Sequence, residues 1–282
     1  NTYMRPTPGR PVMGSGWSPA QGPLGRLRDR TVPHVVERLI DRGLPRLNAA
    51  RRELGLAPLG HVFDALDRCA RVLVMTSPSF DPPAPQLPVN VRYVGPVLDD
   101  PAWATPSPAP LPEGDDPLVL VAMSSTYQAQ QNVLNRIVDA LATMPVRGLV
   151  TLGPGLRPGE VHPAANVAVV QSAPHADVLP RAAAVITHAG HGTVIKALAA
   201  GVPMICLPHG RDQGDNAARV VTTGAGLRLS RRSTATAIRY GVQRVLGEPA
   251  FGDGARRMAD RIAGELLLTS PAAEVEAMLA GT

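Results

Sequence analysis

The chain has 282 residues, of which 44% are hydrophobic and only 3% aromatic, and it carries a formal net charge of +5. No run approaches the ~20 apolar residues that a membrane helix needs, and no clustered arginines are interleaved with aromatic residues as in nucleic-acid-binding proteins. We therefore expect neither a membrane span nor a nucleic-acid partner, but one large or two ordinary globular domains with an aliphatic core.

The first residues, NTYMRPTPGRP, contain no apolar signal core, and the two cysteines, Cys69 and Cys206, lie far apart in the sequence. Because an export signal needs such a core, none is expected here. We predict a cytoplasmic protein in which both cysteines are free thiols.

The first third of the chain is rich in proline and poor in regular elements. Residues 1–30 are irregular, and a helical spacing of apolar residues follows over 33–56. Only two convincing strands occur, at 71–76 and 91–95. We predict that residues 1–98 are a partial N-terminal Rossmann-like domain whose beginning lies upstream of this sequence.

Residues 99–117 consist of prolines, small residues and acidic pairs without periodicity, which is typical of a linker. We interpret its two aspartate pairs, Asp99-Asp100 and Asp115-Asp116, as solvent-exposed charges rather than metal ligands.

After the linker, strands alternate with helices, and the strands are continuous apolar runs. Both features indicate an α/β fold with a parallel sheet covered by helices on two faces. We predict a complete Rossmann-like domain over 118–253 and a helical segment over 254–282 that packs back on the N-terminal part. The expected strands lie at 118–123, 148–152, 167–170, 184–187, 203–207 and 227–230.

The stretch after the strand at 184–187 has the residues of an anion site. Ligands of such sheets bind at the carboxyl ends of the strands, where His188 lies. Gly190 and Gly192 would let the backbone turn tightly and approach a ligand closely. The helix beginning near Thr193 would add amide hydrogens and its dipole, which suit a phosphate or diphosphate. The simpler alternative is an ordinary strand-to-helix turn with a hydrogen-bonded histidine at the strand end.

Asp212 and Gln213 are expected at the carboxyl edge of a second strand. A carboxylate beside an amide offers acceptors and donors for vicinal hydroxyls, so a sugar attached to a diphosphate is a suitable ligand. The alternative is that Asp212 only caps the following helix. We interpret Asn216 as a helix-surface or capping residue rather than a ligand.

Residues 174–226, PHADVLPRAAAVITHAGHGTVIKALAAGVPMICLPHGRDQGDNAARVVTTGAG, closely resemble the C-terminal donor-binding motif of the GT-B glycosyltransferases of family 1. This family includes the UDP-glucuronosyl and glucosyltransferases and the bacterial transferases that decorate polyketide antibiotics. The upstream segments LNAARRELGL, RVLVMTSPSFD and LPVNVRYVGPVL are similar to the segment that leads into the family's interdomain linker. The resemblance therefore covers nearly the whole chain.

The resemblance implies two facing Rossmann-like domains, with the acceptor bound to the N-terminal one and the nucleotide sugar to the C-terminal one. It implies an inverting transfer from a UDP- or dTDP-sugar to a hydroxyl of a small hydrophobic natural product such as a polyketide. No metal and no cofactor are expected, because protein donors neutralise the diphosphate and the nucleotide sugar is a co-substrate. A homodimer is compatible with this family.

The family's functional positions can be carried over residue by residue. The resemblance implies sugar binding by Asp212 and Gln213. It implies nucleoside binding by Ser172, Ala173, Pro174 and His175. It implies diphosphate binding by Ser125, Thr126, His188, Gly190, His191, Gly192 and Thr193.

Three departures from the family pattern matter. Ser172 stands where many relatives have a tryptophan, so stacking on the base must be weaker or supplied elsewhere. Lys196 stands where many have a ribose-binding glutamate, and a lysine cannot accept a hydrogen bond. Lys196 therefore indicates either a deoxyribose donor such as a dTDP-sugar or a surface lysine.

The third departure concerns the family's catalytic base, a histidine just after the first strand of the N-terminal domain. We expect this base upstream of residue 1, and neither His34 nor His61 is assigned to the role. The leading hypothesis is a glycosyltransferase. The alternative is a catalytically incomplete nucleotide-sugar-binding module, or an auxiliary partner of a full glycosyltransferase.

Overall fold

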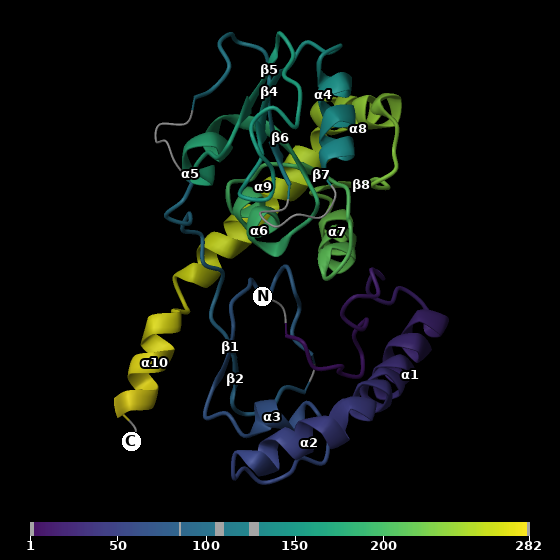
Figure 1. Cartoon of the computed structure of the whole chain (residues 1–282), viewed down its shortest axis with the longest axis vertical. Helices are drawn as coiled ribbons and strands as arrows, with labels where there is room; N and C mark the ends of the chain where they lie inside the picture. The colour runs from purple at the N-terminus through teal and green to yellow at the C-terminus, as the bar shows by residue number, and fades with distance from the viewer. Residues whose placement is uncertain (1–2, 85, 105–109, 124–129, 281–282) are drawn as a thin grey trace.

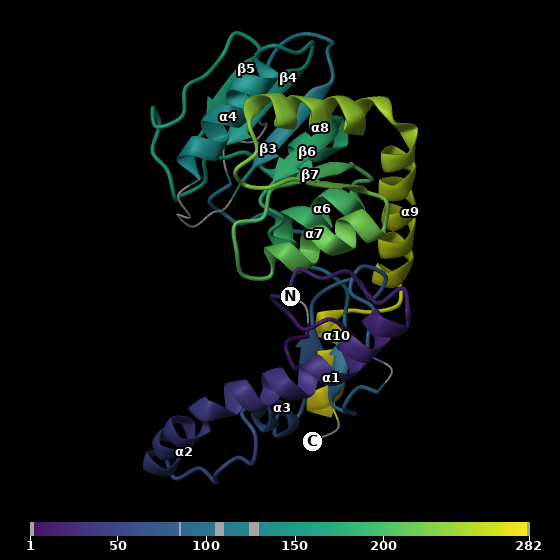
Figure 2. The same ribbon diagram turned by 90° about the vertical axis from the view of Figure 1, so that its right-hand side faces the viewer.

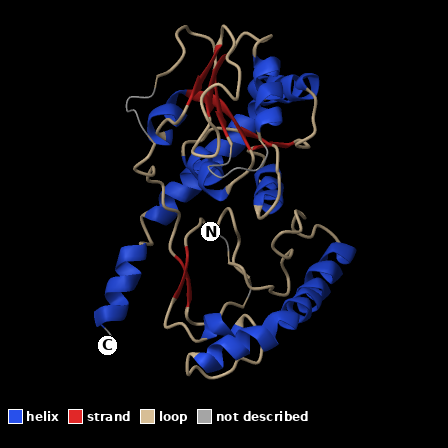
Figure 3. Ribbon diagram, in the orientation of Figure 1, coloured by secondary structure: helices blue, strands red, loops and turns tan. Residues whose placement is uncertain are grey.

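The computed structural model describes residues 3–84, 86–104, 110–123 and 130–280. Figure 1 shows an upper part, built around one sheet from the residues after the linker, and a lower part built from the residues before it. The last two helices run from the upper part down beside the lower one. Figure 3 shows that helix and loop dominate the lower part.

The sheet of the upper part has six strands, all parallel, in the spatial order β5-β4-β3-β6-β7-β8. Each expected strand is present. Along the central strand, side chains alternate between two core clusters: Leu118 and Leu120 face one, and Val119 and Val121 the other. The strands are β3 (Leu118–Ala122), β4 (Arg147–Thr151), β5 (Val167–Val170), β6 (Ala182–Thr187), β7 (Met204–Cys206) and β8 (Gly226–Arg228).

Helices cover both faces of this sheet, as continuous apolar strands require. The two core clusters assign α4 and α8 to one face and α6, α7 and α9 to the other, and Figure 2 shows both layers. A short helical connection, α5 (His175–Val178) and η2 (Leu179–Arg181), joins β5 to β6. The covering helices are α4 (Gln131–Leu141), α6 (His191–Ala199), α7 (Gln213–Thr222), α8 (Ala235–Gly247) and α9 (Pro249–Leu266).

The strand order creates a crevice at one place. From β3 the chain moves outward through β4 to β5, then returns so that β6 pairs with the other side of β3. The chain order thus reverses between the neighbouring strands β3 and β6. Such a topological switch point is where ligands bind in open parallel sheets.

The lower part has two parallel strands, which pair with each other, and a small core that includes Tyr3, Val74 and Val91. Beside it lies α10 (Pro271–Ala280), which is held by an ion pair between Arg71 and Glu274 at 3.4 Å. The other elements are α1 (Pro23–Ile40), η1 (Asp41–Gly43), α2 (Leu44–Glu53), α3 (Asp64–Asp67), β1 (Val72–Val74) and β2 (Val91–Tyr93).

Buried charges join the two parts at α7. Asp81 of the lower part is fully buried and pairs with both Arg10 and Arg219, the latter at 2.7 Å. Asp215 accepts hydrogen bonds from the backbone amides of Gly14 and Gly16, the second at 2.6 Å. Because an unpaired buried carboxylate would be costly, these contacts fix the N-terminal loop against the helix.

No helix within the described residues combines the length and the apolar character that crossing a membrane requires.

Two glycines of α9 provide a matched test of the packing. A Cβ at Gly254 would lie 2.3 Å from the carbonyl oxygen of Gly224, whereas a Cβ at Gly264 would meet nothing within 4 Å. We expect Gly254→Ala to lower the free energy of unfolding by about 1–3 kcal/mol through overpacking. Gly264→Ala should raise it by about 0.5–1 kcal/mol through helix propensity. Urea unfolding measures both, and equal effects would contradict this packing of α9.

Candidate functional site

A cavity of about 450 Å³ lies at the switch point, among the carboxyl ends of β3, β4 and β6 and the first turn of α6. Its volume falls within the range typical of small-molecule sites. It brings together most of the residues predicted from the motif. Those that line it are Ser172, Ala173, His175, His188, Gly190, His191, Gly192, Thr193, Asp212 and Gln213.

The turn between β6 and α6 is built differently from the expectation. Ala189, not a glycine, takes the left-handed conformation, with φ 66°. Its amide donates to Thr187 Oγ1 at 3.2 Å, and its carbonyl accepts from Asn216 Nδ2 at 3.0 Å. Gly190 has φ −63° and is needed for a steric reason, because an added Cβ would lie 2.5 Å from His188 Nε2.

Asn216 is therefore not a helix-surface or capping residue, and that interpretation was wrong. It is fully buried in α7 and its amide bridges two groups of the site. Besides the Ala189 carbonyl, Nδ2 reaches Asp212 Oδ2 at 3.0 Å. One buried side chain thus holds the strained turn and orients a carboxylate at the cavity wall.

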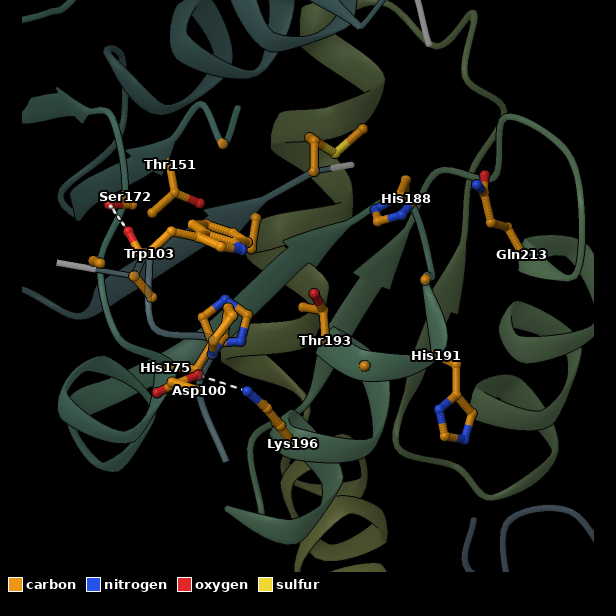
Figure 4. A pocket seen from close by; sticks show the side chains of 18 of the residues that line it. Asp100, Trp103, Thr151, Ser172, His175, His188, His191, Thr193, Lys196 and Gln213 are labelled. Atoms are coloured by element: carbon orange, nitrogen blue, oxygen red, sulfur yellow. Dashed lines mark hydrogen bonds and ion pairs between the residues drawn. The ribbon is translucent and has the colours of Figure 1, made fainter. Parts of the chain in front are cut away.

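The first turn of α6 presents its amides to the cavity. The helix begins at His191, and no side chain among the described residues caps its N-terminus. The amides of this turn lack intrahelical partners, and the helix dipole adds partial positive charge. Figure 4 shows Thr193 within the cavity and the ring of His191 directed away from it. The arrangement suits an anion.

The two histidines of this turn differ in their surroundings. Burial, together with the nearby His209, lowers the pKa of His188 to about 4, so its ring is neutral at pH 7. Burial also lowers the pKa of His191 to about 4. The His191 ring contacts Thr76 Oγ1 of the lower part at 2.8 Å. Its backbone amide, rather than its ring, is therefore the group at the helix N-terminus.

Asp212 and Gln213 have distinct roles. Asp212 occupies the N-cap position of α7, yet its side chain makes no capping hydrogen bond. Gln213 is buried, and its Oε1 accepts from the amides of His209 at 2.7 Å and Gly210 at 3.1 Å. Gln213 thus braces the loop that precedes α7. The carboxylate of Asp212 lines the cavity and is positioned by Asn216.

The linker contributes to the site, which the sequence did not reveal. Lys196 Nζ and Asp100 Oδ1 lie 2.5 Å apart, with side chains only 11% and 14% exposed. The interpretation of Asp100 as a solvent-exposed charge was therefore wrong, although Asp99 is exposed. Of the two alternatives for Lys196, the structure excludes the surface lysine. Burial alone would raise the pKa of Asp100, but hydrogen bonds from the Ala176 amide and Lys196 lower it.

The far end of the cavity contains an unsatisfied polar atom. The buried Nδ1 of His175 has no hydrogen-bond partner in the part of the chain that the structure describes. Burial, with the Lys196 charge, lowers the pKa of this histidine. A buried orphan atom in a cavity wall is a candidate ligand contact.

Among the predicted residues that the structure describes, only Pro174 does not line the cavity. Ser125 and Thr126 lie outside the described residues. Pro174 is buried at the N-cap of α5. The structure pairs His61 Nδ1 with Asp41 Oδ2 at 2.6 Å, but both residues belong to the lower part, whereas α6 belongs to the upper part (Figures 1 and 2).

A parallel sheet with this switch-point cavity has the architecture of the GT-B glycosyltransferases, and comparison with solved structures confirms that fold. The chain is 28% identical to CalG4, the calicheamicin glycosyltransferase, with a TM-score of 0.64 over 90% of this chain and 59% of that one. It is 24% identical to the spinosyn rhamnosyltransferase SpnG complexed with thymidine diphosphate, with a TM-score of 0.60 over 82% of this chain and 60% of that one.

The sequence comparisons define the family. The C-terminal domain of proteins like erythromycin biosynthesis protein CIII matches residues 135–278, and the chain belongs to this family. It is also 34% identical to 4'-demethylrebeccamycin synthase of Lentzea aerocolonigenes over 259 residues. That match covers 89% of this chain and 61% of the relative, so the chain spans about three-fifths of the relative's length. The family resemblance seen in the sequence is confirmed.

The lowered pKa of His188 predicts a pH dependence of stability. Between pH 6.5 and about 4 the unfolded chain binds a proton that the folded His188 does not, so stability is lost as the pH falls through this window. The lost contribution is roughly 3 kcal/mol, at about 1.4 kcal/mol per pKa unit. In His188→Gln, the decline of the unfolding free energy over this window should be shallower by that amount. Denaturant unfolding at a series of pH values measures it.

His34→Gln is the matched control, because His34 is exposed. The decline of the unfolding free energy in His188→Gln should be shallower than the decline in this control. If the unfolding free energy of His188→Gln declined with pH in parallel with that of the unmodified chain, His188 would not be buried and neutral in the folded state.

Proposed function

We propose that the cavity binds the nucleoside diphosphate of a nucleotide sugar, and that the chain takes part in transferring that sugar to a hydroxyl of a natural-product acceptor. The observation that carries this proposal is the convergence at α6. Uncapped amides of its first turn, the neutral ring of His188 and the carboxylate of Asp212 meet in one cavity. Amides and an N–H donor suit phosphate oxygens, and a carboxylate suits sugar hydroxyls.

Lys196 supports a choice between the two donor nucleotides. An ammonium group cannot accept a hydrogen bond from a ribose 2′-hydroxyl, and this one is paired with Asp100. A deoxyribose nucleotide requires no such acceptor, so we favour a dTDP-sugar over a UDP-sugar. The complex of SpnG with thymidine diphosphate supports the preference.

The proposed reaction is a direct displacement with inversion. The acceptor hydroxyl attacks the anomeric carbon, the bond between that carbon and the diphosphate oxygen breaks, and a base on the acceptor side takes the hydroxyl proton. Charge then develops on the leaving diphosphate. The first turn of α6 and His188 would stabilise that charge with preorganised donors, so the proposal assigns this role to protein groups and not to a metal.

The role of His188 can be separated from the role of the nucleoside pocket. We expect His188→Ala to weaken dTDP binding by about 10- to 100-fold, the loss of one hydrogen bond to a charged group. The affinity for thymidine, which lacks phosphate, should fall by less than about twofold, because His188 is assigned to phosphate alone. Titration calorimetry measures both affinities, with His34→Ala as the exposed control. If the unmodified chain bound neither dTDP nor UDP, the proposed function would be wrong.

Asp212 and Gln213 make different predictions because only one of them braces a loop. Asp212→Asn should lower the affinity for a dTDP-sugar by about tenfold and leave the affinity for dTDP unchanged, since the carboxylate is assigned to the sugar. Gln213→Ala should lower the affinity for both ligands, because the amides of His209 and Gly210 lose their acceptor and the loop before α7 loses its support. Calorimetric titration of each variant with both ligands tests this. If Asp212→Asn lowered the affinity for both ligands equally, Asp212 would have a structural role and not a sugar-binding one.

A further inference from the structure

A segment of the linker crosses the cavity and is fixed there at three points. We call residues 100–104 the linker strap. Asp100 Oδ2 accepts from the Ala176 amide at 2.8 Å, and Asp100 Oδ1 pairs with Lys196. Further along, the carbonyl of Trp103 accepts from Ser172 Oγ at 3.3 Å. The strap is therefore held to α5, α6 and the loop after β5.

The side chain that this strap carries into the cavity is an indole. Trp103 is 50% exposed although its backbone is anchored, and it lines the cavity. Figure 4 shows its ring between Thr151 and His175, at the end away from His188 and Gln213. Among the described residues lining this cavity, it is the only tryptophan, tyrosine or phenylalanine. An apolar ring that an anchored strap holds half-exposed inside a cavity is available to contact a flat ligand there.

A second observation at the same end points to a ligand with polar edges. His175 lies next to Trp103 in Figure 4, and its buried Nδ1 has no hydrogen-bond partner within the described part of the chain. A flat group with an apolar face and a hydrogen-bonding edge would satisfy both residues. A nucleobase has this chemistry, and bases stack on aromatic side chains with about 1–3 kcal/mol each.

We propose that Trp103 stacks on the base of the bound nucleoside diphosphate, and that the linker strap, latched by Lys196 and Ser172, positions it. This inference rests on the proposed function, because it assigns the base end of the same cavity. The nucleoside subsite is then completed by the linker rather than by the sheet domain alone. Lys196 is a positioning residue that acts through Asp100, and Ser172 is one that acts through the Trp103 carbonyl.

The chain has two tryptophans, so each can be observed alone. Trp17 stacks beneath Arg28, 4.8 Å from its guanidinium carbon, and does not line this cavity. In Trp17→Phe all tryptophan emission comes from Trp103. We expect dTDP to quench or shift that emission and inorganic pyrophosphate, which has no base, to leave it unchanged.

Titration calorimetry measures how much Trp103 contributes to the affinity. Trp103→Ala should bind dTDP about 5- to 100-fold more weakly, with pyrophosphate unchanged, and Trp103→Phe should retain most of the affinity. Trp17→Ala is the matched control and should bind both ligands normally. Trp103 is half-exposed, so these variants are expected to fold, which thermal unfolding checks.

The latch is tested by combination. Lys196→Met should lower the affinity for dTDP. The double variant Lys196→Met/Trp103→Ala should bind dTDP no more weakly than Trp103→Ala alone, because both changes remove the same stacking contact. Additive losses, or a loss of pyrophosphate binding in Lys196→Met, would show that Lys196 contacts the ligand directly and would overturn the latch.

The remaining outcomes separate the two proposals. If Trp103→Ala binds dTDP as tightly as the unmodified chain, or if emission of Trp17→Phe does not respond to bound dTDP, the stacking proposal is overturned while the proposed function stands. If the unmodified chain binds pyrophosphate at least as tightly as it binds dTDP or UDP, the nucleoside contributes nothing to binding. Both the stacking proposal and the proposed function are then overturned. If the chain binds neither ligand, the proposed function fails first and the inference with it.

Discussion

The site depends on one constraint, the turn by which β6 becomes α6. Ala189 adopts a left-handed conformation that costs a non-glycine residue about 1 kcal/mol or more. It is stabilised there by a buried hydrogen bond from Asn216. The same turn places His188 against Gly190, where no Cβ could fit. The direction of α6, the position of His188 and, through Asn216, the orientation of Asp212 are therefore set together.

Helix α6 also connects the site with the rest of the chain. At its first residue, the ring of His191 contacts Thr76 of the lower part. One and a half turns later, Lys196 pairs with Asp100 of the linker. The face of the helix between these contacts lines the cavity. The element that presents its amides to the cavity thus also contacts the lower part and the linker. These two polar contacts lie close to the site, in addition to the buried charges that join the two parts at α7.

Much of the fold and part of the site could be predicted from sequence, for local reasons. The six strands are continuous apolar runs, and their alternation with helices specifies a parallel sheet. The switch-point rule then places His188 and the start of α6 at the ligand edge. The errors concern polar residues whose partners are distant in sequence. Asp100 and Lys196 are 96 residues apart, and in isolation each has the character of a solvated charge. Asn216 resembles a capping residue until Ala189, 27 positions earlier, is seen to contact it.

The sequence by itself determined the class of fold, the motif and those residues of the cavity that belong to the motif, because these follow from local hydrophobic patterns and short spacings. Tertiary structure alone decided what each polar group does. It showed that Ala189 carries the positive φ, that Gln213 braces a loop, that the His191 ring is engaged elsewhere, and that Trp103 enters the cavity. The physical reason is that hydrogen bonds and ion pairs act over about 3 Å. Their partners are therefore chosen by how the chain folds back on itself, which no local pattern encodes.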